Sequence, residues 1–155
     1  MKILDCTLRD GGYHTNWEFE PNFVRDLIAV LDGVGVDVIE LGYKSPLRGG
    51  KYKKCNDKFI KNTLGFIPKS KLSFMVDTKD FVVDNKLDYN LIKNNIHKNS
   101  IFSMCRVATT LDFLDYAKEL VEYLHSIGYE TTINLVRASL LDKKTLQDAI
   151  KKCDD

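Results

Sequence analysis

Residues 4–12, Leu4-Asp5-Cys6-Thr7-Leu8-Arg9-Asp10-Gly11-Gly12, form the stretch that decides the fold of this chain. The short apolar and polar alternation predicts a β-strand over Ile3–Thr7, and the glycines predict a loop over residues 11–20. The charged pair Arg9 and Asp10 therefore follows a strand end. Such a charged pair is typical of a functional site at the edge of a sheet, because burying unpaired charge inside a core is costly.

Strand-like and helix-like segments alternate along the rest of the chain. Val24, Leu27, Ile28 and Leu31 recur at helical spacing, so a helix is predicted from Pro21. Further strands are predicted over Val36–Leu41, Leu72–Val76, Ile101–Val107 and Thr131–Val136, and further helices over Tyr89–Ile96, Leu111–Ile127 and Thr145–Lys152. Gly128 occupies the position that commonly ends a helix, and a basic loop is predicted from Lys44 to Lys61.

This alternation predicts an α/β fold built from about five parallel β-α units, because parallel strands need crossover connections. Two architectures remain open at this point. One is a small doubly wound sheet, which is complete at about this length. The other is part of a (β/α)8 TIM barrel, whose full form takes ~250 residues.

Composition excludes several classes of protein. The 155 residues carry 23 Lys and Arg against 22 Asp and Glu, so positive and negative charges nearly balance. The composition therefore does not predict binding to nucleic acid or to an anionic membrane. No apolar run reaches the ~20 residues of a membrane span. The four cysteines are dispersed, and Cys6 and Cys105 lie in strand-like runs where we expect buried, reduced thiols. The sequence therefore predicts a cytoplasmic protein.

Polar side chains follow the predicted strands at their carboxyl ends, where chemistry is assembled in both architectures. Arg9 and Asp10 follow the first strand, Glu40 lies near the end of the second, and Arg106 and Asn134 lie late in the fourth and fifth. Two-residue alternation places Glu40 opposite Ile39 and Leu41. The set predicts a polar site, and the alternative is an ion-pair network of Asp5, Arg9 and Glu40.

The segment 4–12 resembles the signature of the DRE-type metal-dependent TIM-barrel lyase superfamily, which includes hydroxymethylglutaryl-CoA lyase-like and 4-hydroxy-2-oxovalerate aldolase-like enzymes. The family's Thr-Leu-Arg-Asp-Gly run is matched at residues 7–11, and residues 39–43 with Ser45-Pro46 resemble its second strand. The run at residues 11–17 is closest to the aldolase-like members. The resemblance covers residues 1–155 as one domain and implies a partial TIM barrel of about five units.

The resemblance implies carbon–carbon bond cleavage of a hydroxy-2-oxo acid or acyl substrate through an enolate. Arg9 matches the family's catalytic arginine, Glu40 the glutamate that orients it, and Asp10 the carboxylate ligand of a divalent cation. Mn²⁺ or Mg²⁺ suits an oxygen-rich site, and added histidines would also admit Zn²⁺. We assign Arg106 and Asn134 to substrate binding.

The candidate general base is His14. His14 follows Asp10 closely, and an imidazole side chain suits a proton shuttle. Aldolase relatives have a histidine in this loop, and here Tyr13 stands at the aligned position with His14 next to it. The alternative is an exposed His14 with no role.

The spacing of the histidines limits the metal ligands that this chain can supply by itself. The family's later His-x-His pair supplies two metal ligands, but His14, His97 and His125 are far apart. We therefore expect the N-terminal portion of a larger barrel, inactive by itself, whose partner is the missing C-terminal half. The alternative is a non-catalytic half-barrel that forms a homodimer through its open strand edges.

Overall fold

The structure is a computed structural model that describes residues 1–47, 52 and 55–154. Six residues of the predicted basic loop, 48–51, 53 and 54, lie outside the described residues, and they include the basic residues Arg48, Lys51, Lys53 and Lys54.

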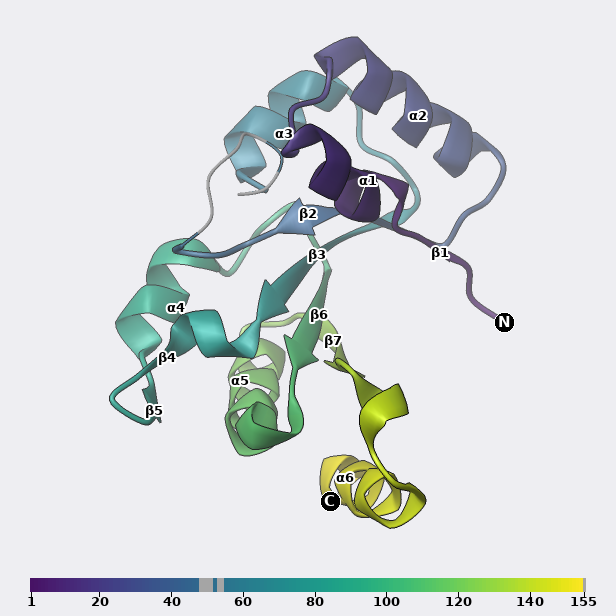
Figure 1. Cartoon of the computed structure of the whole chain (residues 1–155). Coiled ribbons are helices and arrows are strands. Elements are labelled where there is room, and N and C mark those ends of the chain that lie inside the picture. Colours follow the sequence, from purple (N-terminus) through teal and green to yellow (C-terminus); the bar gives the residue numbers. More distant parts are fainter. Residues whose placement is uncertain (48–51, 53–54, 155) are drawn as a thin grey trace.

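Five parallel strands form the central sheet in the order β1-β2-β3-β6-β7 (Figure 1). The strands are Leu4–Asp5 (β1), Val38–Tyr43 (β2), Lys71–Asp77 (β3), Met104–Thr109 (β6) and Glu130–Leu135 (β7). Their order along the sheet never reverses. A doubly wound sheet requires a reversal at its switch point, so the structure excludes that alternative and confirms the partial barrel.

Helices connect successive strands. The first connections contain Thr7–Thr15 (α1), Pro21–Gly33 (α2) and Asp57–Leu64 (α3). Between β3 and β6 lie the 3-10 helix Thr78–Phe81 (η1), the hairpin strands Val82–Val83 (β4) and Lys86–Leu87 (β5), and Tyr89–Asn95 (α4). The last connections contain Leu111–Phe113 (η2), Leu114–Ser126 (α5), Ala138–Leu140 (η3) and Lys143–Asp154 (α6). The helices α2 and α3 lie together at one end of the sheet and α6 at the other (Figure 1).

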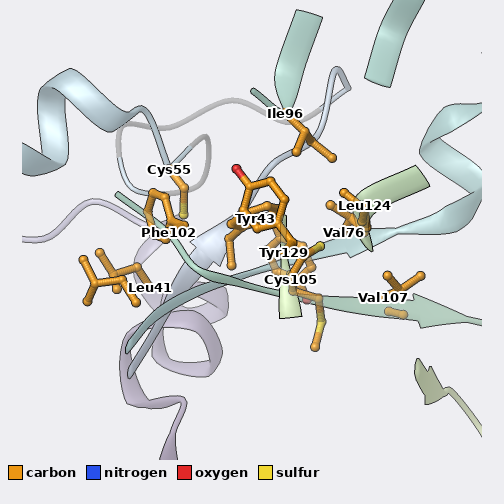
Figure 2. Close-up of a cluster of buried hydrophobic side chains, with 14 of the residues drawn as sticks. Leu41, Tyr43, Cys55, Val76, Ile96, Phe102, Cys105, Val107, Leu124 and Tyr129 are labelled. Carbon is orange, nitrogen blue, oxygen red and sulfur yellow. The ribbon is translucent and has the colours of Figure 1, made fainter. Parts of the chain in front are cut away.

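The core lies between one face of the sheet and the helices. Strand register pairs Ile39 with Leu72, Phe74 with Cys105 and Val76 with Val107, which places these apolar side chains on one face. Several of them are seen together in Figure 2. The helices contribute Val24 and Ile28 of α2, and Ala117, Leu120 and Leu124 of α5. The helix stripes predicted from apolar spacing are therefore confirmed.

Two predicted loops contain helices, which corrects the prediction at those positions. The predicted strand Ile3–Thr7 shortens to Leu4–Asp5 because Asp5 accepts hydrogen bonds from the backbone N (3.0 Å) and the Oγ1 (2.9 Å) of Thr7 and turns the chain. The helix α1 then begins at Thr7, within what was expected to be strand and loop. Its two glycines are poor helix formers, so tertiary packing overrides local propensity here.

The second correction is α3, which lies within the predicted basic loop. The side chain of Asn56 caps this helix by accepting a hydrogen bond from the backbone N of Phe59 at 3.0 Å. Ile60 and Leu64 are buried one turn apart on its inner face. The lysines around them obscured this short amphipathic pattern in the sequence.

Within the described residues, no helix is long and apolar enough to cross a membrane. All four cysteines are described, and none forms a disulfide. Cys105 is buried as expected, and burial raises the pKa of its thiol. Cys6 differs from the expectation: it is half-buried, because the chain leaves the sheet one residue before it.

Candidate active site at the carboxyl ends of the strands

Glu40 is fully buried in β2 and binds two arginines. Its Oε1 accepts a hydrogen bond from Arg9 Nε at 2.7 Å and another from Arg106 Nη1 at 3.0 Å. These residues come from α1, β2 and β6, so the fold brings together three of the predicted site residues. Part of the predicted ion-pair network is therefore present, but Asp5 lies outside it and binds Thr7 instead.

The guanidinium of Arg9 is held as a cation with its outer edge available. Burial works against its charge, but the hydrogen bond and negative charge of Glu40 outweigh burial and raise the pKa of Arg9. The bonds to Glu40 and Asp10 use Nε and Nη1. Neither of these bonds uses Nη2, whose two N–H groups can bind an oxyanion.

Arg9 lines a cleft of about 540 Å³ at the carboxyl ends of the strands. This volume is suited to a small metabolite. The residues that line the cleft are Arg9, Tyr13, Tyr43, Met75, Asp77, Lys79, Ala108, Asn134, Leu135 and Val136. Asn134, predicted from the sequence, is therefore in the cleft, and Arg106 reaches the site through Glu40.

A larger cavity of about 790 Å³ lies near the start of β3, where Lys71 and Leu72 line it. We favour the smaller cleft as the functional site for a physical reason. In barrels of this type the catalytic groups gather at the carboxyl ends of the strands, and the opposite end mainly contributes stability.

Tyr43 enters the cleft because β2 is irregular near its end. Strict alternation would place Tyr43 on the same face as Ile39 and Leu41. The register between β2 and β3 shifts between Glu40 and Tyr43, and Tyr43 lines the cleft beside Arg9. Tyr43 was not predicted as a site residue from the sequence, although Gly42 inside the strand is a signal of a bulge.

A turn after α1 supports the same side of the cleft. Asn16 and Trp17 have positive φ values of 52° and 55°, which fold the indole back onto Gly12. A Cβ atom on Gly12 would lie 2.2 Å from the Nε1 of Trp17, so only glycine permits this contact. The buried Trp17 ring then packs against Tyr13 (4.7 Å between centroids) and Tyr43 (5.8 Å).

Asp10 and His14 lie one turn apart on α1 and are both exposed, and neither lines the cleft. Asp10 pairs with Arg9 and also accepts a hydrogen bond from the Sγ of Cys6 at 3.1 Å. Tyr13 lines the cleft, whereas His14 does not. The structure thus brings together Arg9, Glu40, Arg106 and Asn134 and leaves Asp10 and His14 at the rim.

The described residues do not fit a divalent cation by themselves. They contain no group of three or more His, Cys, Asp or Glu side chains placed to hold a metal ion. Two guanidinium groups already neutralise Glu40, so a cation beside it would meet net positive charge. Asp10 therefore stays a predicted metal ligand, and a complete metal site would need further ligands from outside the described residues.

Comparisons with known proteins agree with the resemblance seen in the sequence. No protein-family model matches the chain. A 4-hydroxy-2-oxovalerate aldolase of Mycolicibacterium smegmatis is 28% identical over 151 residues, which cover 94% of this chain and 41% of the aldolase. An oxaloacetate decarboxylase of Mycobacterium tuberculosis is 24% identical over 164 residues, which cover 99% of this chain and 44% of the decarboxylase.

One solved structure extends this likeness to three dimensions. The N-terminal domain of a candidate aldolase from Bacteroides vulgatus has a TM-score of 0.73 and 28% identity. It covers 99% of this chain and 52% of that chain. The chain therefore spans about two fifths of the curated relatives it matches and corresponds to their N-terminal part.

Proposed function

Because this chain is similar to the N-terminal part of 4-hydroxy-2-oxovalerate aldolases along nearly its whole length, we propose that it supplies the N-terminal half of an aldolase-type active site. The intact site would cleave a carbon–carbon bond of a hydroxy-2-oxo acid, and the chain alone would be inactive. The observation that carries this proposal is the Arg9 guanidinium, which Glu40 fixes at the edge of the cleft.

The names of the relatives define a shared substrate class. Both 4-hydroxy-2-oxovalerate and oxaloacetate are 2-oxo acids in which cleavage between C3 and C4 leaves the enolate of pyruvate. In the aldol case, a base removes the proton of the C4 hydroxyl, the C3–C4 bond breaks, and the C4 fragment leaves as an aldehyde. The electron pair of the broken bond forms the C2–C3 double bond, and the carbonyl pair moves to the C2 oxygen. The enolate then takes a proton at C3. We propose a 2-oxo acid of this class as the substrate.

Arg9 has the geometry to stabilise the charge that develops on the C2 oxygen. Its side chain lines the cleft, and its position is fixed by Glu40, so little reorganisation is needed as the charge forms. Glu40 acts as the positioning residue, and Arg106 supports it from β6. We assign Asn134 to substrate binding, because its amide lies in the same cleft.

Two further roles follow from the resemblance. We propose His14 as the general base and Asp10 as one ligand of Mg²⁺ or Mn²⁺, with the other ligands contributed from beyond the described residues. A divalent cation bound there would supply Lewis-acid stabilisation of the enolate. The dispersed, reduced cysteines support the cytoplasm as the location of the protein.

Binding of oxalate, a stable mimic of the pyruvate enolate, tests the Arg9 assignment in this chain. We expect wild-type protein to bind oxalate with a dissociation constant in roughly the millimolar range by NMR titration. Arg9→Gln should abolish binding, and Arg9→Lys should weaken it about tenfold, because lysine lacks the planar fork. Arg25→Gln, which changes an exposed arginine of α2, is the matched control.

Two results would contradict the proposal. One is the absence of oxalate binding by the wild-type chain, and the other is unchanged binding by Arg9→Lys. The lysine variant keeps the charge opposite Glu40, so it decides the question even where Arg9→Gln fails to fold.

A second candidate function, a half-barrel module that forms a homodimer, rests on the edge of β7. Among the described residues β7 pairs only with β6, and its side chains are exposed or half-buried. An unpaired edge of six residues is a template for pairing with another chain. Light scattering after size-exclusion chromatography should then give twice the monomer mass of 17.8 kDa. A monomer at every concentration would exclude this candidate.

A further inference from the structure

We propose that the hydroxyl of Tyr43 is a second oxyanion-binding group of the cleft, and that Tyr13 competes with the ligand for it. This inference rests on the proposed function, because the ligand it concerns is the same 2-oxo acid. It assigns roles to two phenols that the resemblance and the relatives leave without any. Their hydroxyl oxygens lie 2.5 Å apart in the cleft that Arg9 lines.

The position of Tyr43 is fixed by its surroundings. Its side chain is only 4% exposed, and it lies at the end of β2 just past the register shift. The ring packs edge-on against Trp17 at 5.8 Å, and Trp17 is itself locked by its contact with Gly12. The hydroxyl of Tyr43 is therefore a pre-organised hydrogen-bond donor.

Tyr43 is also close to the cation of the site. Negative charge on its phenol would raise the pKa of Arg9, so the two groups lie within electrostatic reach of each other. Both line the same cleft. A planar anion there meets the Nη2 donors of Arg9 and a phenolic O–H, two donor types that suit a carboxylate beside an enolate oxygen.

Tyr13 differs from Tyr43 in its freedom to move. Its side chain is 57% exposed and lies on α1, one turn after Arg9. Rotation of this ring would give up its edge contacts with Trp17 at 4.7 Å and Tyr43 at 6.4 Å, but more than half of Tyr13 is already in contact with solvent. A carboxylate oxygen is a stronger acceptor than a neutral phenol, so an anionic ligand should replace Tyr13 as the partner of the Tyr43 hydroxyl.

Phenylalanine variants separate the two roles, because they keep the rings and remove only the hydroxyls. In an NMR titration with oxalate, Tyr43→Phe should weaken binding roughly tenfold. Tyr13→Phe should bind as tightly as wild type or a few-fold tighter, because it removes the competitor. Tyr89→Phe is the matched control, because the Tyr89 hydroxyl binds Glu119 at 2.7 Å and does not line the cleft.

A second measurement follows the hydroxyls directly. With tyrosine labelled by ¹³C at Cζ, oxalate should shift the signals of Tyr13 and Tyr43 together and leave Tyr89 unchanged. A merely structural role for the phenols would not produce this pattern. The emission of Trp17 in each variant checks that the aromatic contacts persist.

The outcomes also distinguish this inference from the proposed function. If oxalate binding depends on Arg9 but not on the hydroxyl of Tyr43, this inference fails and the proposed function stands. If Tyr13→Phe weakens binding as much as Tyr43→Phe, the competition is wrong, because both phenols then hold the ligand. If wild-type protein does not bind oxalate, both proposals fail.

Discussion

Arg9 and Glu40 are 31 positions apart in the chain, and the Nε of one donates to the Oε1 of the other at 2.7 Å. Glu40 is fully buried, whereas the side chain of Arg9 retains 13% of its exposure. The second oxygen of Glu40, Oε2, is buried without a hydrogen-bond partner among the described residues. The pair therefore joins α1 to the sheet and presents a charged donor to the cleft.

Replacing Glu40 should lower stability strongly. Glu40→Gln leaves Arg9 and Arg106 without their shared counter-charge, and breaking a buried pair in this way costs about 3–5 kcal/mol. Because both arginines keep some contact with solvent, we expect about 2–3 kcal/mol, measured as the free energy of unfolding in urea. Glu122→Gln, at an exposed position of α5, should change it by less than about 0.5 kcal/mol. Equal effects of the two changes would contradict a structural role for Glu40.

Asp57 should make stability depend on pH in the acid range. Burial favours its neutral form, but hydrogen bonds from Ser100 and Lys44 outweigh burial and lower the pKa of Asp57. Its folded-state pKa is thus below the unfolded value of about 3.9. The stabilisation is fully present above that value and is lost as the pH falls through the folded-state pKa.

Unfolding measurements between pH 2 and 5 test this assignment. Asp57→Asn should flatten the acid branch of the stability curve relative to wild type. The control is Asp112→Asn, which changes an exposed carboxyl and should leave the acid branch as it is. Superimposable curves for wild type and Asp57→Asn would show that the Lys44–Asp57 contact of 2.9 Å contributes nothing.

The adjacent glycines Gly11 and Gly12 should respond in opposite ways to alanine. A Cβ on Gly12 would lie 2.2 Å from the indole of Trp17, whereas a Cβ on Gly11 has its nearest neighbour at 4.0 Å. Gly12→Ala should displace the ring and destabilise the protein, and Gly11→Ala should stabilise α1 by about 0.5–1 kcal/mol. Trp17 is the single tryptophan, so its fluorescence reports the displacement directly. Native-like emission in Gly12→Ala would contradict this reading of the turn.

Metal binding by this chain should be weak. Asp10 contributes one carboxylate, and the described residues supply no cluster of three potential ligands around it. We expect Mn²⁺ to bind with a dissociation constant above ~10 μM in isothermal titration, weaker than sensor-type sites. Tighter binding that Asp10→Ala abolishes would show that the chain forms a complete site. In the same buffer, the chain should release no pyruvate from 4-hydroxy-2-oxovalerate.

Much of the fold could be predicted because the helix and strand patterns are carried by apolar spacing. The strands of the main sheet and the helices α2, α4, α5 and α6 lie within three residues of their predicted positions, except that the first strand is shorter, whereas the hairpin strands β4 and β5 were not predicted. The helix α1 could not be predicted, because Gly11 and Gly12 both argue against a helix and only the contact with Trp17 explains the glycine at position 12. Local sequence cannot reveal such a contact.

The residues of the candidate site were also only partly predictable from the sequence. Arg9, Glu40 and Arg106 could be placed together, because the carboxyl ends of parallel strands share one edge of a sheet. Tyr43 was missed because a single register shift reverses the face of every residue after it. The roles of Asp10 and His14 stay predictions, since both lie at the rim of the cleft.

The order of the strands has a consequence for how the molecule assembles. Each strand of the main sheet hydrogen-bonds only to strands that come immediately before or after it in that sheet's chain order. No late segment has to insert between early ones, so the β-α units can form one after another as the chain emerges from the ribosome. Growth at the β7 edge is thus additive, because a further β-α unit can pair there without displacing any strand formed earlier.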